Sequence, residues 1–358
     1  MSCSRRHFLQ TAGTGLVIAN RLLPIQPLYA LTPPVTASPT VGRSRVALVQ
    51  GENRRKNITS ALTAIDDQIQ PRLKGKKYVI IKPNNVSTNN QLASTHVDAL
   101  RGILDYLAPR FNGPVVIAES SAEQTLEGFE SFHYAAVIPE YRPQQVRLVD
   151  LNQEARYQAI QLVDYDLHPV RVRLAARLLD PEAFVISAAI LKTHDTVVAT
   201  MAVKNMVLGS PLHSAPGEKP EWSDKEKYHS GIRQTHYNML LTAQKLQPNW
   251  GVAVIDGFEG MEGQGPTQGT PVPSRIALAS TDFVAADRVG LETMGIKADW
   301  IGYLQYCAQA GLGQYDLAKI DVQGAAIAEV RRSYKMHGDL KLQLDWMGPL
   351  THLPPKLG

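Results

Sequence analysis

Short apolar runs rich in Val and Ile recur along this chain, and they constrain its fold more than any other feature. Helix-like stretches lie between several of them, at 57–69, 95–107 and 284–294. This alternation predicts an α/β fold, in which a mostly parallel sheet carries helices on both faces, as one unit or two closely joined lobes. The runs expected to be buried strands are 45–50, 78–82, 115–119, 146–151, 184–190, 251–256 and 275–280.

The first 30 residues predict a twin-arginine signal peptide. Arg5 and Arg6 stand side by side before a mildly apolar run at 11–19. This run is shorter than the ~20 apolar residues that a spanning helix needs. An ordinary basic tail is the alternative, but it gives no reason for an apolar run after paired arginines. We therefore expect the twin-arginine machinery to export the protein to the periplasm or an equivalent extracytoplasmic space, with no membrane span in the mature protein.

The rest of the chain divides into a Pro/Thr/Ser-rich linker at 31–44, an α/β domain at 45–335 and a C-terminal tail at 336–358. Three arginines of the signal account for most of the formal net charge of +4, so the mature chain is close to neutral and no nucleic-acid partner is expected. The chain has two cysteines, Cys3 and Cys307. An iron–sulfur cluster needs about four thiolates, so the protein is not expected to hold such a cluster of its own. Any resident cofactor would therefore use nitrogen or oxygen ligands.

Polar and ionisable residues follow four of the predicted strands. Ligands of parallel sheets gather at the carboxyl ends of the strands, so a shared site is expected there. The alternative is that each group is a solvated strand end with capping residues. The four groups are Lys82-Pro83-Asn84-Asn85, Glu119-Ser120-Ser121, Lys192-Thr193-His194-Asp195 and Asp256.

The segment 193–209 predicts one apolar helix that ends at a glycine. At helical spacing, Thr196, Thr200 and Lys204 would form a narrow polar stripe on it. A lysine in that setting must reach water, a carboxylate or an anionic ligand, because an unpaired buried ammonium is costly. Lys192 and His194 would flank the start of this helix, where free amide groups favour an anion. The alternative is that Lys204 forms a buried ion pair.

The glycine-rich segment 256–269 contains Asp256, Glu259 and Glu262 but lacks the Gly-Lys-Ser/Thr ending of a phosphate-binding loop. Its carboxylates are candidates for holding a hard cation or for acid–base chemistry, and a solvated surface turn is the alternative. The polar segment 210–238 predicts a long lid or binding loop. Its histidines, His213, His229 and His236, match no zinc signature.

Several short motifs in this order resemble the family catalogued as domain of unknown function 362. The resemblance covers most of the chain after the signal but implies no reaction. Some relatives carry ferredoxin-like cysteine modules, which are absent here, so an electron-transfer role does not follow. The motifs are Lys82-Pro83-Asn84, Lys192-Thr193-His194, Lys204-Asn205, Asp256-Gly257, residues 261–266, Ser280-Thr281-Asp282 and Ala286-Asp287.

Together these patterns favour an exported enzyme that acts on a small anionic substrate, assisted or not by a divalent metal. The alternative is a non-catalytic carrier of an anion or metal, or an assembly factor for another exported protein. The expected catalytic residues are Lys192, His194 and Lys204; the expected substrate-binding residues are Lys82, Asn84 and Asn205; the candidate metal ligands are Glu119, Asp256 and Glu262.

Overall fold

The unit of the chain that the computed structural model describes spans residues 42–217 and 223–349. The predicted signal at 1–30 lies outside the described residues. Within them, no helix is long and apolar enough to cross a membrane.

A ten-stranded sheet forms the centre of this unit, in the order β12-β1-β11-β9-β7-β2-β3-β4, with β8 and β10 paired to β7 and β9. Neighbours are parallel from β9 through β7, β2 and β3 to β4, and β12 is parallel to β1. The mostly parallel sheet is thus confirmed. The strands are β1 (Ser44–Gln50), β2 (Tyr78–Pro83), β3 (Val115–Glu119), β4 (Arg147–Asp150), β7 (Ala183–Thr193), β8 (Ala199–Thr200), β9 (Trp250–Glu262), β10 (Thr270–Val272), β11 (Ile276–Ser280) and β12 (Ile320–Gly324).

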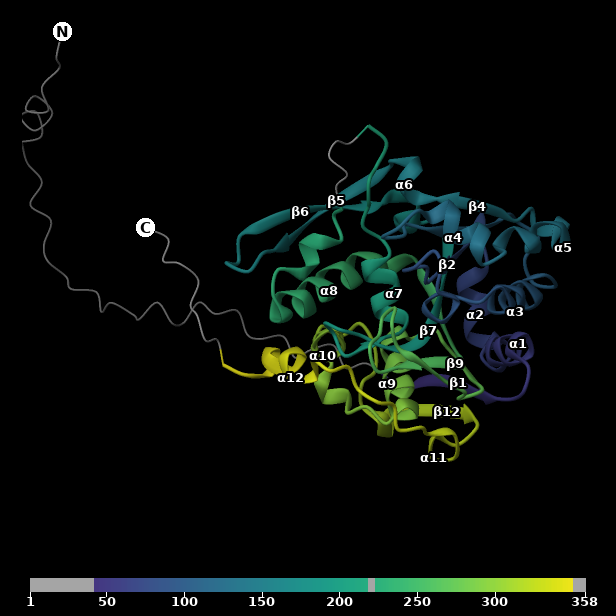
Figure 1. Cartoon of the computed structure of the whole chain (residues 1–358). Coiled ribbons are helices and arrows are strands. Elements are labelled where there is room, and N and C mark those ends of the chain that lie inside the picture. The colour runs from purple at the N-terminus through teal and green to yellow at the C-terminus, as the bar shows by residue number, and fades with distance from the viewer. Residues whose placement is uncertain (1–41, 218–222, 350–358) are drawn as a thin grey trace, which may run out of the picture. The chain divides into compact units, whose positions relative to one another are not determined.

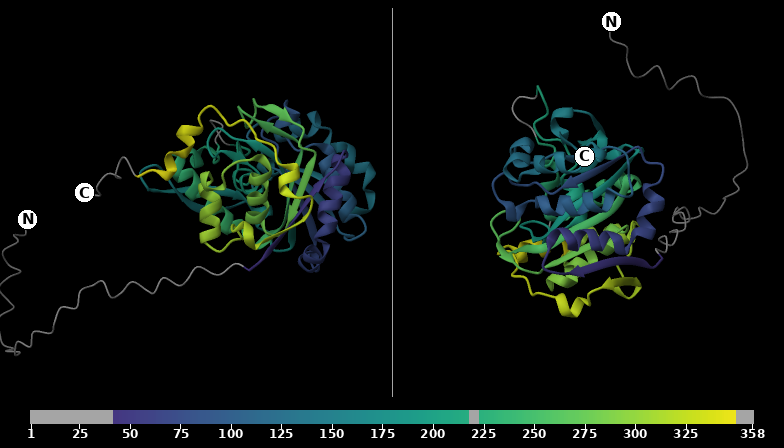
Figure 2. Two further views of the ribbon diagram at one scale, coloured as in Figure 1. Left: turned by 90° about the horizontal axis from the view of Figure 1, so that it is seen from below. Right: turned by 90° about the vertical axis from the view of Figure 1, so that its right-hand side faces the viewer.

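Helices cover both faces of the sheet, as the alternation predicted (Figure 1). Figure 2 shows the same layers from two further directions, with the purple and blue helices on one face and the green helices on the other. The first face carries α1 (Arg54–Ala64), α2 (Asp66–Leu73), α3 (Val97–Leu107), α4 (Thr125–Ser131) and α5 (Val137–Glu140). The second carries α7 (Ala202–Leu208), α8 (Ile232–Leu246), α9 (Phe283–Met294), α10 (Gly302–Gln309) and α11 (Ile327–Val330). The short helices α6 (Leu151–Glu154) and α12 (Leu340–Gln343) complete the set.

Strand β2 shows why the central strands are apolar at nearly every position. Val79 and Ile81 pack into the cluster under α1 and α3, whereas Ile80 between them packs into the cluster under α7 and α9. Successive side chains of a strand point to opposite faces, so burial on both faces requires an unbroken apolar run.

A β-hairpin and helix α8 are among the elements that have no counterpart among the predicted ones. Strands β5 (Tyr157–Val163) and β6 (Pro169–Ala175) form a separate antiparallel hairpin. Helix α8 begins at Ile232, so the prediction of a loop through residue 238 is wrong. His236 is one of the residues that α8 buries completely. Its apolar partners come from distant parts of the chain, which the composition of the segment does not reveal.

The prediction of a single helix over 193–209 is also wrong. Strand β7 continues through Thr193, a short loop and β8 follow, and α7 begins only at Ala202. Val198 has a φ of 69°, which no right-handed helix accommodates. The β-branched residues at 196–198 and 200 favour extended backbone. The expected polar stripe therefore does not exist, and Lys192 and His194 stand at a strand end rather than at a helix start.

Asp256 does not stand at a strand end. Strand β9 runs on to Glu262, and Asp256 lies inside the sheet between Ile190 of β7 and Ala277 of β11. It is buried beside Arg54 of α1, with Arg54 Nε 3.0 Å from Asp256 Oδ2. The ion pair supplies the opposite charge that a buried carboxylate needs, so a polar residue is tolerated within the strand.

Candidate functional site

A cavity of about 290 Å³ lies where β2, β3 and β7 end, beside α7. These strands are parallel neighbours, so their carboxyl ends meet at one edge of the sheet. Five of the nine predicted site residues line the cavity, and four do not. The five are Asn84, Glu119, His194, Lys204 and Asn205, and the other four are Lys82, Lys192, Asp256 and Glu262.

Lys82 and Glu119 form a buried ion pair at this edge. The Nζ of Lys82 is 2.9 Å from the Glu119 carboxylate, and neither side chain is more than 2% exposed. Glu119 also accepts hydrogen bonds from the backbone N–H groups of Asn85, at 3.2 Å, and Ser120, at 2.8 Å. The carboxylate is therefore well satisfied within the protein, and Lys82 uses its charge to hold it.

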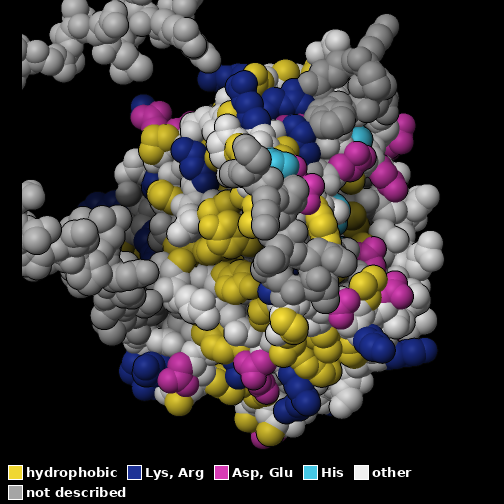
Figure 3. Space-filling model, turned by 90° about the vertical axis from the view of Figure 1, so that its left-hand side faces the viewer, with side chains coloured by type: hydrophobic (Ala, Val, Ile, Leu, Met, Phe, Trp, Pro, Cys, Tyr) yellow, Lys and Arg dark blue, Asp and Glu magenta, His cyan; other side chains and the backbone are white. Residues whose placement is uncertain are grey.

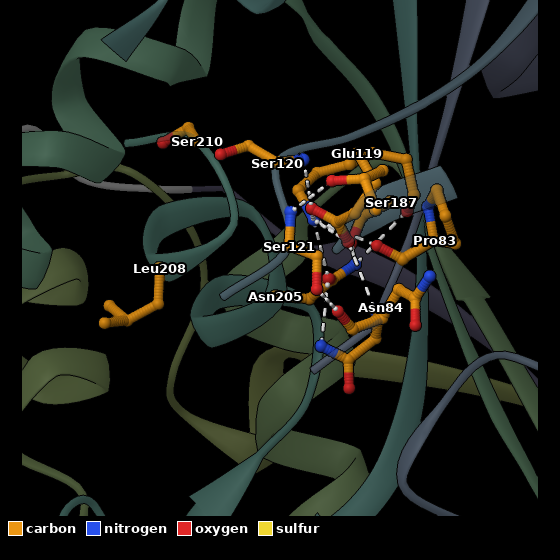
Figure 4. Close-up of polar contacts among 12 residues, drawn as sticks. Pro83, Asn84, Glu119, Ser120, Ser121, Ser187, Asn205, Leu208 and Ser210 are labelled. Atoms are coloured by element: carbon orange, nitrogen blue, oxygen red, sulfur yellow. Dashed lines mark hydrogen bonds and ion pairs between the residues drawn. The ribbon is translucent and has the colours of Figure 1, made fainter. Parts of the chain in front are cut away.

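Asn205 of α7 connects this ion pair to the neighbouring strand. Its Oδ1 accepts from Lys82 Nζ at 3.0 Å and from Asn84 Nδ2 at 3.3 Å. Its Nδ2 donates to Ser187 Oγ of β7 at 3.0 Å. Figure 4 shows Glu119, Asn205 and Ser187 converging on one cluster of polar contacts. The register of β2 against β7 places Lys82 opposite Ser187, a relationship that the motifs do not reveal.

Lys192 is fully buried and does not line the cavity. Its Nζ donates to the carbonyl oxygens of Ala93, at 2.9 Å, and Pro266, at 3.3 Å. Burial, and then the nearby Lys204, lower the pKa of Lys192 well below its usual value. These two hydrogen bonds connect Lys192 to the segments that contain Ala93 and Pro266. The contacts of Lys192 are therefore those of a structural lysine.

His194 and Asp195 line the cavity from the loop after β7. The Nδ1 of His194 accepts a hydrogen bond from the backbone N–H of Thr196 at 3.0 Å and lies 2.9 Å from Asp195 Oδ1. Burial, together with the charge of Lys204, lowers the pKa of His194 to about 3. The imidazole is therefore neutral near pH 7, whereas Asp195, which is half exposed, carries a negative charge.

Lys204 of α7 lines the same cavity and is only 9% exposed. In the part of the chain that the structure describes, its ammonium group has no hydrogen-bond or ion-pair partner. Burial lowers the pKa of Lys204 to about 8; Asp195 raises it, and Lys82 lowers it further. Among the described residues, Lys204 therefore forms no buried ion pair, because Glu119 pairs with Lys82 instead.

Lys225 also lines the cavity, and no sequence pattern indicated it. Its Nζ donates to Leu208 O and Pro211 O, both at 2.9 Å, and to Ser120 Oγ at 3.2 Å. Burial lowers the pKa of Lys225 to about 7. Three acceptors occupy its three N–H groups, so Lys225 adds positive potential to the cavity without a free donor.

Asp287 of α9 holds the start of α7. Its carboxylate accepts from the backbone N–H groups of Ala202, at 2.8 Å, and Val203, at 3.0 Å. The residue is fully buried, and burial raises the pKa of Asp287 to about 7. Because Lys204 follows one residue after Val203, Asp287 fixes the position of the helix turn that carries it.

The three candidate metal ligands are held in different places. Glu119 pairs with Lys82, Asp256 pairs with Arg54, and Glu262 accepts from the backbone N–H of Lys335 at 2.8 Å. Among residues 42–217 and 223–349, no three His, Cys, Asp or Glu side chains lie close enough together to hold a metal ion. A bound divalent metal stays a prediction from the sequence.

A larger hollow of about 900 Å³ lies elsewhere, between the β5–β6 hairpin, the start of α8 and the segment around α12. Figure 3 views the side of the molecule where these elements lie and shows apolar side chains gathered at its centre. The lining of this larger hollow includes Tyr165, Tyr237 and Trp346 and none of the predicted site residues. The smaller cavity is therefore the one that brings the predicted chemistry together.

A family model, a curated protein and a solved structure are similar to this chain. The family model described as domain of unknown function (DUF362) matches residues 79–292. A thylakoid-associated protein of Synechocystis sp. is 30% identical over 120 residues, which span 33% of this chain and 34% of that protein. A crystal structure of a Thermotoga maritima protein is similar with a TM-score of 0.42 and 9% identity, over 74% of this chain and 60% of that chain.

Proposed function

We propose a function from one premise: the chain belongs to the family described as domain of unknown function 362. Our proposal is that this member is an exported enzyme that binds a small anionic substrate in the cavity lined by Lys204. Export is supported by the paired Arg5 and Arg6 before an apolar run. The anionic substrate is supported by the charges around the cavity.

The observation that carries the proposal is the unpartnered ammonium group of Lys204. It is only 9% exposed and lines a cavity, and no described residue accepts a hydrogen bond from it. An unpaired buried charge is costly, and a bound anion would remove that cost. Lys225 strengthens the attraction, because a bound anion favours the charged form of this second buried lysine in the lining.

The same residues suit proton transfer. A pKa of about 8 leaves Lys204 able both to donate and to accept a proton near neutral pH. The neutral imidazole of His194 and the carboxylate of Asp195 line the same cavity and are candidate proton carriers. This supports an enzyme over a carrier that only retains its ligand.

Calorimetric titration of the purified mature protein with sodium sulfate tests the anion site. Lys204→Met keeps most of the length and the apolar stem but removes the charge, so sulfate affinity should fall about 10- to 100-fold, as for loss of hydrogen bonds to a charged group. Lys56→Met is the matched control, because it removes one charge from an exposed position of helix α1. Unchanged sulfate binding by the Lys204 variant would end the proposal.

Native mass spectrometry of the exported protein, followed by incubation with the small acids that it retains, separates an enzyme from a carrier. Chemical conversion of a retained acid by wild type, and its loss in Lys204→Met, is the result expected of an enzyme. Stoichiometric retention without conversion would favour the carrier.

A further inference from the structure

We propose that Lys204 is a nucleophile that forms a Schiff base with a small 2-oxo acid. This inference rests on the proposed anion site and names its substrate class. It follows from the one feature that separates Lys204 from the other buried lysines, which is the state of its N–H groups.

Four lysines are buried in the described part of the chain, and three of them donate hydrogen bonds to other residues. Lys82 binds Glu119, Lys192 binds two backbone carbonyls, and Lys225 binds three oxygens. Lys204 alone among these four has no acceptor and faces open space in a cavity. No hydrogen bond has to be broken before its nitrogen can attack a ligand.

The surroundings favour the neutral amine that such an attack requires. Burial is the main cause of the lowered pKa of Lys204, and the positive charge of Lys82 adds to it. With a pKa of about 8, roughly a tenth of the molecules carry the free amine at pH 7, far more than for an exposed lysine. Desolvation and neighbouring cations are the means by which lysine amines become nucleophiles in enzymes.

The step balances without any external oxidant or reductant. Loss of one proton from the Lys204 ammonium frees a lone pair, which forms a bond to the carbonyl carbon. The carbonyl oxygen then takes up that proton and one of the two protons left on the nitrogen. The carbon–oxygen bond then breaks, one water leaves, and a protonated imine remains. Asp195, whose carboxylate lines the same cavity, is the group placed to hold the first of these protons between its two transfers.

A 2-oxo acid fits both properties of the site. Its carboxylate is attached directly to the carbonyl carbon, so the positive nitrogen of the protonated imine stays next to the negative group. The ion pair between lysine and ligand therefore persists through the reaction. The volume of about 290 Å³ holds on the order of ten waters, which limits the substrate to a small acid.

The test is reductive trapping with sodium pyruvate and sodium cyanoborohydride, followed by peptide mapping by mass spectrometry. We expect a reduced pyruvate adduct on Lys204, at least about tenfold more abundant than on exposed lysines such as Lys56, because a lowered amine pKa speeds attack. Acetone under the same conditions should give little adduct, because it lacks the carboxylate. Absence of an adduct at Lys204 in folded wild-type protein that binds sulfate would overturn the inference.

Lys204→Arg separates the inference from the proposed function. Arginine keeps the positive charge but cannot form the imine, so the variant should still bind sulfate while the pyruvate adduct is lost. If neither wild type nor Lys204→Arg binds sulfate, the anion site itself is wrong. If both bind sulfate and wild type gives no adduct, only the Schiff base is wrong.

Discussion

The ammonium group of Lys82 and the carboxylate of Glu119 meet at 2.9 Å with both side chains almost completely buried. This pair explains why no described residue pairs with Lys204, since Glu119 at the end of β3 is already neutralised. Under the proposed function, stability and ligand binding are assigned to different lysines.

Replacing Glu119 with Gln should destabilise the protein by about 3–5 kcal/mol, because the charge of Lys82 stays buried without its partner. Urea denaturation of wild type and variant measures this. The double variant Lys82→Met/Glu119→Leu should recover much of the loss, since it removes both charges. The exposed pair of Lys77 and Glu182 provides the control, and Glu182→Gln should leave the urea midpoint unchanged. Equal midpoints for Glu119→Gln and wild type would contradict the buried pair.

Lys204→Met should fold and be at least as stable as wild type at pH 7. The folded-state pKa of Lys204 is lowered to about 8, so its charged form destabilises the folded state fully below pH 8. Between pH 8 and 10.5, Lys204 is neutral in the folded protein but still protonated in the unfolded chain. Wild type therefore gains stability relative to the variant as the pH rises through this range. The shift predicts a relative gain on the order of 3 kcal/mol. A variant 3–5 kcal/mol less stable at pH 7 would mean that Lys204 balances a carboxylate.

Asp287→Asn should change the pH dependence of stability in the opposite direction. Burial raises the folded-state pKa of Asp287 to about 7, so its protonated form is favoured in the folded protein. As the pH rises from 4 to 7, wild type should therefore lose stability relative to the variant, by on the order of 4 kcal/mol. Thermal melts at pH 4, 5.5 and 7 measure the difference. Parallel curves for the two proteins would show that Asp287 is already ionised in the folded state.

Replacing both Arg5 and Arg6 with Lys should leave the full-length precursor in the cytoplasm, because the export receptor reads the paired guanidinium groups. Cell fractionation with detection of the intact and shortened chains measures this. A variant at Arg43 and Arg45, two arginines beyond the predicted signal, serves as the control and should be exported normally. Export of the Arg5/Arg6 variant at the wild-type level would remove the twin-arginine interpretation.

The sequence by itself determined the class of fold and the edge of the sheet where polar groups gather. Apolar runs mark the strands because a strand covered on both faces has no solvated position, and this physical demand is local. The strand-end rule then placed Asn84, Glu119 and His194 at one edge, and the cavity lies there. It failed for Asp256, since nothing local signals that β9 continues beyond it.

Only the tertiary structure decided which lysine holds which acid. Lys82, Lys192 and Lys204 look equivalent as lysines beside short polar motifs, but their roles follow from the order of β7, β2 and β3 and from the position of α7. That order places Lys82 in an ion pair with Glu119 and places Lys192 next to backbone carbonyl groups. The physical reason is that charge pairing acts over a few ångströms between residues far apart in the chain, so it is settled by packing and not by any local pattern.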